Sequence, residues 1–155
     1  MSRQSAATAD RLIESVLKWA KEQAIVRAVA LVGSYANGTA RPESDIDFVL
    51  LTTTPTAYRD DTRWLDGIDW GFVGSAPAKW ADEDYGSLWS RRVWLKKDCG
   101  ELEISFALPS WAAINPTDPG TWQVIADGCR ILYDPDGLLT RLTAVVSNGP
   151  GQVQS

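Results

Sequence analysis

One stretch constrains the fold of this chain more than any other: two apolar strands joined by a loop of small residues. Residues 25–32 (IVRAVALV) are β-branched and apolar, which predicts a largely buried strand that ends at Gly33. Residues 33–44 are rich in turn formers, and residues 45–51 (DIDFVLL) predict the next strand. The centre of the fold should therefore be a sheet whose second strand opens with two carboxylates.

These two carboxylates should lie on the same face of their strand. Side chains alternate between the two faces, so Asp45 and Asp47 are expected on one side while Ile46 and Phe48 enter the core. Adjacent carboxylates repel each other and cost stability unless a cation lies between them. The pattern therefore indicates a site for a hard cation such as Mg²⁺.

Gly33 and Ser34, at the end of the first strand, suit phosphate binding. Glycine lets a phosphate approach the backbone closely, and Ser34 adds a hydroxyl donor beside its own amide. A helical turn starting near Ser34 would also direct its first amides at the phosphates. A P-loop is excluded, because Thr39-Ala40 stand where that motif requires Lys and Ser/Thr.

The other elements predict an α/β or α+β fold, with a mixed sheet that contains an antiparallel hairpin and is flanked by helices. We expect a first helix from about Asp10, as its N-cap, to Gln23, and a short helix within 55–65. Residues 66–90 should be mostly loop with a short strand at 68–73, followed by a hairpin of strands 91–97 and 101–108 with Asp98-Cys99-Gly100 between them. A helix at about 118–126, a strand at 130–133 and a closing helix at about 136–146 should complete the chain. One domain should cover residues 1–147, with a flexible tail at 148–155.

Composition excludes several kinds of chemistry. The chain has no histidine, which removes Ser-His-Asp and Cys-His catalysis and every histidine-containing zinc site. Its net charge of −5 disfavours a nucleic-acid polymer as substrate, because such proteins present a basic face. Two cysteines, Cys99 and Cys129, are too few for a disulfide framework. No apolar run suits a bilayer span or a signal peptide, so we expect a cytoplasmic protein with no membrane contact.

The motifs together resemble a known family. Val32-Gly33-Ser34 and Asp45-Ile46-Asp47-Phe48 are similar to the hG[GS] and [DE]h[DE]h signature of the DNA polymerase β-like nucleotidyltransferase superfamily. The GTARPESDID stretch and the later LYDPDG segment also resemble short, single-domain bacterial nucleotidyltransferase-domain proteins. This resemblance implies the transfer of a nucleoside monophosphate from a nucleoside triphosphate, foremost ATP, to a hydroxyl of an acceptor, with release of pyrophosphate.

The resemblance also implies roles for individual residues. Gly33 and Ser34 would bind the triphosphate, and Asp45 and Asp47 would ligate two Mg²⁺ ions, with Mn²⁺ as an alternative. In such a reaction the metals stabilise the attacking and leaving oxygens.

A third carboxylate is expected on a later strand, where residues 101–106 (ELEISF) offer Glu101 and Glu103 on one face. Either could complete the catalytic and metal-binding set. We favour Glu103, because a residue in the middle of a strand is held more firmly than one beside the Gly100 turn.

The chain departs from the family at Tyr35, where many relatives carry Arg or Lys after the Gly-Ser pair. Arg41 in the loop, or Arg92 on the predicted hairpin, could supply the missing positive charge to the nucleotide.

The acceptor stays open at this level, because the family's helical acceptor-binding domain is absent from the sequence pattern. A small molecule such as an aminoglycoside-like antibiotic is one option, and a toxin partner modified by an antitoxin is another. A non-catalytic member that only binds nucleotide is the third. The Trp- and Gly-rich residues 64–90 could form a lid or the interface of a homodimer, or their tryptophans could simply pack in the core.

Overall fold

The computed structural model describes residues 6–41, 44–95 and 100–148, and the structural statements below concern these ranges. The helices are α1 (Ala6–Lys21), α2 (Ser34–Asn37), α3 (Thr56–Asp60), α4 (Pro119–Asp127) and α5 (Leu138–Ser147). The strands are β1 (Val26–Val32), β2 (Ile46–Thr52), β3 (Lys79–Asp84), β4 (Leu88–Trp94), β5 (Glu101–Ala107) and β6 (Cys129–Tyr133). Short 3-10 turns are η1 (Thr62–Gly67), η2 (Gly71–Val73) and η4 (Pro109–Ala112).

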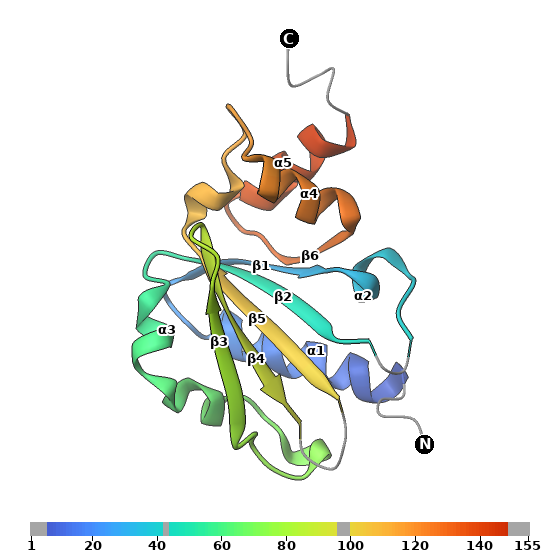
Figure 1. The fold of residues 1–155 in the computed structure, drawn as a ribbon, viewed down its shortest axis with the longest axis vertical. Coiled ribbons are helices and arrows are strands. Elements are labelled where there is room, and N and C mark those ends of the chain that lie inside the picture. Colours follow the sequence, from blue (N-terminus) through green and yellow to red (C-terminus); the bar gives the residue numbers. More distant parts are fainter. Residues whose placement is uncertain (1–5, 42–43, 96–99, 149–155) are drawn as a thin grey trace.

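Within the described ranges, the six strands form one sheet in the order β3-β4-β5-β2-β1-β6. β2 and β5 run parallel, and every other neighbouring pair is antiparallel. Helix α1 lies on one side of this sheet, while α4 and α5 lie together beyond β1 and β6 (Figure 1). The expected mixed sheet flanked by helices, with an antiparallel β4–β5 pair, is confirmed.

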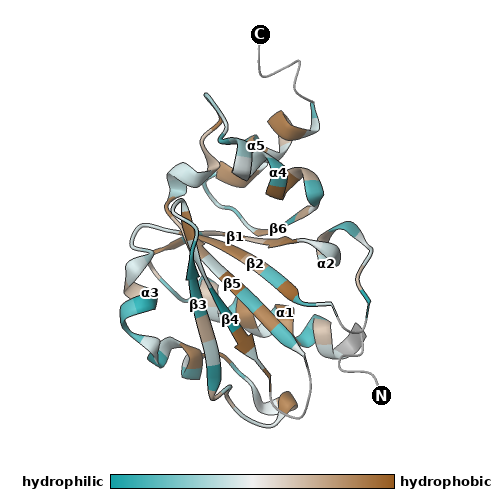
Figure 2. Cartoon of the chain, viewed as in Figure 1, coloured by the Kyte–Doolittle hydropathy of each residue, from teal (hydrophilic) through white to brown (hydrophobic). Residues whose placement is uncertain are grey.

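The two faces of the sheet bury different sets of side chains. Along β2, Ile46, Phe48 and Leu50 pack towards α1, whereas Val49 and Leu51 pack towards α4 and α5. β2 and β5 show bands of both hydropathy colours because each contains acidic as well as apolar residues (Figure 2). On the face that α4 and α5 cover, Asp47, Ser90, Glu103 and Ser105 line a pocket beside α4.

Two local expectations were wrong. Helix α1 begins at Ala6, so Asp10 lies inside it and is not its N-cap. The residues before Asp10 include three alanines, which are strong helix formers and extend the helix backwards. The expected strand at 68–73 is replaced by a turn and η2, where the Trp70 indole donates a hydrogen bond to the Leu65 carbonyl at 2.6 Å.

The rest of residues 66–90, expected as a loop, contains β3 and the first residues of β4. Most tryptophans of this region pack inside the chain: Trp70 and Trp89 are buried, and Trp64 stacks on Trp19 with ring centroids 5.1 Å apart. Trp80 is 37% exposed on the edge strand β3. Core packing therefore accounts for most of the tryptophan-rich stretch.

Some expectations concern residues outside the described ranges. Asp98 and Cys99 of the β4–β5 connection and residues 149–155 of the expected tail are among these. No helix of the described part of the chain is both long and apolar enough to cross a membrane.

Candidate active site

Four side chains from four adjacent strands form a row across one face of the sheet. Val32 on β1 pairs with Asp47 on β2, Asp47 pairs with Glu103 on β5, and Glu103 pairs with Arg92 on β4. Strand pairing thus brings residues 47 and 103 together although they are far apart in the sequence. Asp47 and Glu103 are therefore direct neighbours on adjacent strands.

Arg92 holds the carboxylates around it. Its guanidinium donates to Asp45 Oδ2 at 2.6 Å, and its nitrogens lie 3.5 Å from Glu101 Oε1 and 3.8 Å from Glu103 Oε2. These side chains are 21–35% exposed, so solvent screens the pairs only in part. Arg92, which was expected to offer its positive charge to the triphosphate, is therefore paired with the acidic cluster in this structure.

Ionisation of Asp47 is unfavourable in this acidic cluster. Burial raises the pKa of Asp47 to about 7, with further contributions from the negative charges of Glu103 and Asp45, against the opposing effect of Arg92. Burial also raises the pKa of Glu103, where Arg92 again opposes the shift. The site therefore holds more negative charge than its single arginine compensates.

Gly33 lies directly against Asp47. It has a φ of 77°, and a Cβ at this position would be 2.8 Å from Asp47 Oδ2. Only glycine fits both the backbone conformation and the close approach. Ser34 then begins α2, as expected, and its carbonyl accepts from the amides of Gly38 and Thr39 at 3.1 Å. The predicted phosphate-binding loop and the carboxylates are immediate neighbours.

The loop is also tied to the end of α4, through two residues that the sequence did not single out. The Gly33 amide donates to the Gly128 carbonyl at 3.3 Å, and the Asn37 side-chain amide donates to the Asp127 carbonyl at 2.8 Å. A Cβ on Gly128 would be 2.9 Å from the Asn37 Cβ. These contacts link residues about ninety positions apart, which no local sequence pattern could indicate.

A pocket of about 620 Å³ opens beside the carboxylates. Asp47 and Glu103 line it, together with Gly120 and Val124 of α4 and with Trp111. Ser90 and Ser105 also line it, and their buried hydroxyls lie 2.6 Å apart in a mutual hydrogen bond. Strand alternation could have identified both serines, since residues 90 and 92 share a face, as do residues 103 and 105.

The acidic side chains suit a divalent cation by their chemistry. Asp45, Asp47 and Glu103 offer only oxygen donors, which Mg²⁺ and Mn²⁺ prefer, and their mutual repulsion would be relieved by added positive charge. In the part of the chain that the structure describes, no three ligating side chains already enclose a common point. Arg92 stands between Asp45 and Glu103, within 2.6 and 3.8 Å of their carboxylates.

Arg41 is exposed in the loop that connects α2 to β2. Its backbone amide donates to Ser44 Oγ at 2.8 Å, and its carbonyl accepts from the Ser44 amide at 2.9 Å. This turn places Arg41 on the same loop as the phosphate-binding residues, shortly before the carboxylates of β2.

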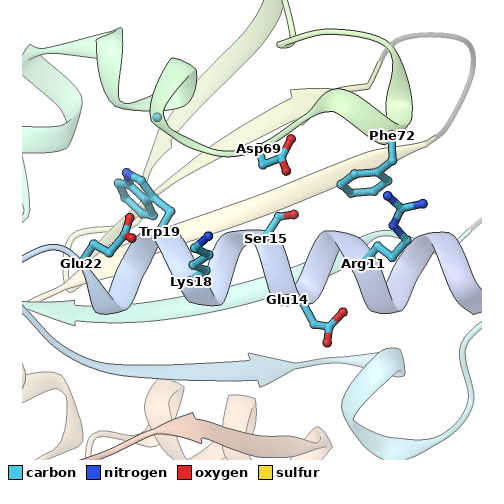
Figure 3. A pocket seen from close by; sticks show the side chains of 9 residues that line it. Arg11, Glu14, Ser15, Lys18, Trp19, Glu22, Asp69 and Phe72 are labelled. Carbon is cyan, nitrogen blue, oxygen red and sulfur yellow. The ribbon is translucent and has the colours of Figure 1, made fainter.

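Another hollow lies on the opposite side of the sheet, between α1 and residues 67–72 (Figure 3). It carries charges of both signs, and the Arg11 guanidinium stacks over the Phe72 ring at 4.5 Å from its centroid. The sheet separates this hollow from Asp47 and Glu103, so it is not part of the candidate site.

Residues 11–85 match the nucleotidyltransferase domain family. The matched range includes Gly33, Ser34, Asp45 and Asp47, while Glu103 lies beyond its end. Among curated proteins, none matches the chain significantly.

Proposed function

We propose that this protein is a nucleotidyltransferase that transfers a nucleoside monophosphate from ATP to an acceptor hydroxyl. The match of residues 11–85 to the nucleotidyltransferase domain family supports this proposal. Pyrophosphate is the other product. The acceptor is a small molecule or a protein. The observation that carries the proposal is the contact of Gly33 with Asp47, together with the pairing of Asp47 with Glu103.

We assign the phosphate-binding and metal-binding roles to separate groups of residues. Gly33 and Ser34 bind the β- and γ-phosphates, because their backbone lies beside the carboxylates and allows close approach. Asp45, Asp47 and Glu103 would hold two Mg²⁺ ions, which would supply charge stabilisation for the attacking and leaving oxygens.

Glu103 faces the pocket and is placed to accept the proton of the acceptor hydroxyl.

Arg92 supplies a positive charge to the site. It is paired with Asp45 and Glu103 in the structure, and with metal ions on those carboxylates its positive charge would be available to the triphosphate. Arg41, exposed on the phosphate-binding loop, offers a second positive charge to the same group.

Thermal unfolding with Mg²⁺ and ATP tests the proposal. The melting temperature should rise with MgCl₂ and rise further with ATP, because ligands that bind only the folded state stabilise it. Glu103→Gln should abolish the metal-dependent gain and any transfer.

Glu101→Gln is the matched control, because it removes the same charge from the same face of β5 yet should keep both effects. A wild-type protein that shows no shift with either ligand would refute the proposed function. If Glu101→Gln rather than Glu103→Gln abolished the shift, the third carboxylate would be Glu101.

A further inference from the structure

The pocket beside the carboxylates differs in chemistry from the phosphate-binding loop. Its walls are largely apolar, from Val49, Leu88, Trp111 and Val124. The charged side chains that line it, among the described residues, are all acidic: Asp47, Glu103 and Asp118. Apolar walls of this kind suit a flat, uncharged ring. The volume of about 620 Å³ lies within the range of small-ligand pockets.

Helix α4 connects this pocket to the phosphate-binding loop. Gly120 and Val124, in its first and second turns, line the pocket, while the Asp127 and Gly128 carbonyls at its end hold Asn37 and Gly33. The nine residues of α4 span about 13 Å at 1.5 Å per residue. A ligand with its phosphates on Gly33 can therefore extend along α4 into the pocket.

We propose that this pocket binds the nucleobase of the donor nucleotide, and that the paired hydroxyls of Ser90 and Ser105 are its polar recognition element. The inference rests on the proposed function. Either hydroxyl can donate in the 2.6 Å pair, so the other is left to donate to or accept from a base edge.

Paired binding measurements test this assignment. The probes are α,β-methylene-ATP, whose α–β linkage cannot be cleaved by the transfer, and inorganic tripolyphosphate, which has no base; both are titrated by calorimetry with Mg²⁺. Val124→Trp fills the pocket from α4 and should weaken nucleotide binding by about tenfold or more. Tripolyphosphate binding should stay within about twofold of wild type, because the loop is untouched.

A second variant removes the recognition element without filling the pocket. Ser90→Ala/Ser105→Ala deletes both partners of one hydrogen bond, so no hydroxyl is left unsatisfied and folding should be preserved. Nucleotide binding should weaken by about fivefold, again with tripolyphosphate unchanged. If Val124→Trp fails to fold, this variant decides the question alone.

Val146→Trp is the matched control, since it puts the same ring into a separate hollow between α4 and α5. It should bind both probes as wild type does. Equal weakening of both probes by the pocket variants, or no weakening of either, would overturn the nucleobase assignment. Failure of the wild-type protein to bind either probe would instead refute the proposed function.

Discussion

At the scale of single residues, the site is governed by an excess of negative charge on one sheet face. Asp45, Asp47, Glu101 and Glu103 share Arg92 as their close cation among the described residues. Strand alternation predicted that Asp45 and Asp47 face away from the core, and the burial of Ile46 and Phe48 confirms it. The position of Arg92 depended on the register of β4 against β5, which the sequence left open.

The raised pKa of Asp47 has a consequence for stability without metal. Its folded-state pKa of about 7 is above the unfolded value of 3.8, so the folded protein binds more protons between these values. Stability from this group is greatest below pH 4 and is lost as the pH rises towards 7. Asp47→Asn should therefore raise the free energy of unfolding at pH 8 in EDTA by on the order of 2–4 kcal/mol.

Denaturant unfolding in EDTA at pH 5 and pH 8 measures this effect. The variant should gain far less at pH 5, where wild-type Asp47 is already protonated. Asp66→Asn, on the exposed surface of η1, is the control and should change neither value appreciably. An Asp47→Asn protein that is less stable than wild type at pH 8 would contradict the prediction.

At the scale of elements, the apolar strands and the capped helices were predictable and the edge of the sheet was not. β1 and β2 have continuous apolar runs, and α4 has Asp118 as an N-cap that accepts from the Gly120 and Thr121 amides. β3 (KWADED) lacks such a signal, because all six of its residues are exposed. Its strand conformation comes from pairing with β4, which is a tertiary effect.

A buried arginine holds β3 in place. Arg91 is 1% exposed, and two of its nitrogens donate to the two Asp82 oxygens at 2.7 Å. Its guanidinium also lies 5.2–5.6 Å from the ring centroids of Trp64, Trp80 and Trp89. The charged β3 and the tryptophan-rich segment are thus fixed by one side chain.

Removing the partner of this arginine should be costly. Asp82→Ala leaves a buried guanidinium without its carboxylate, and we expect a loss of about 2–4 kcal/mol in the free energy of unfolding. Asp84→Ala removes a neighbouring carboxylate whose ion pair with Arg59 is solvent-exposed, so its cost should be below about 1 kcal/mol. Urea titration of both variants compares their free energies of unfolding directly. Equal losses would show that the buried Arg91–Asp82 pair contributes no more stability than the exposed Arg59–Asp84 pair.

At the scale of the whole molecule, the two apolar layers share one sheet. One layer contains α1, and the other contains α4 and α5, but both use side chains of β1 and β2. That residues 1–147 form a single domain stays a prediction. The match to residues 11–85 covers only part of the sheet and leaves β5 outside.

Because of this shared sheet, the layers should unfold together. Tryptophan fluorescence and far-UV circular dichroism should give coincident urea transitions, since neither layer keeps its packing without β1 and β2. Trp111→Phe, which removes a tryptophan from the layer containing α4 and α5, should leave the fluorescence midpoint close to the dichroism midpoint. Two separated transitions would show that the layers are independent units.

The parallel pairing of β2 with β5 also determines at which stage of folding and synthesis the candidate site can form. The connection between them runs from residue 53 to residue 100 and includes β3 and β4. Closing so long a connection costs chain entropy before any pairing is gained, which slows folding. On the ribosome, a nascent chain that already carries Asp45 and Asp47 still lacks the strand that supplies Glu103. The candidate site therefore cannot form until the second half of the chain has been synthesised.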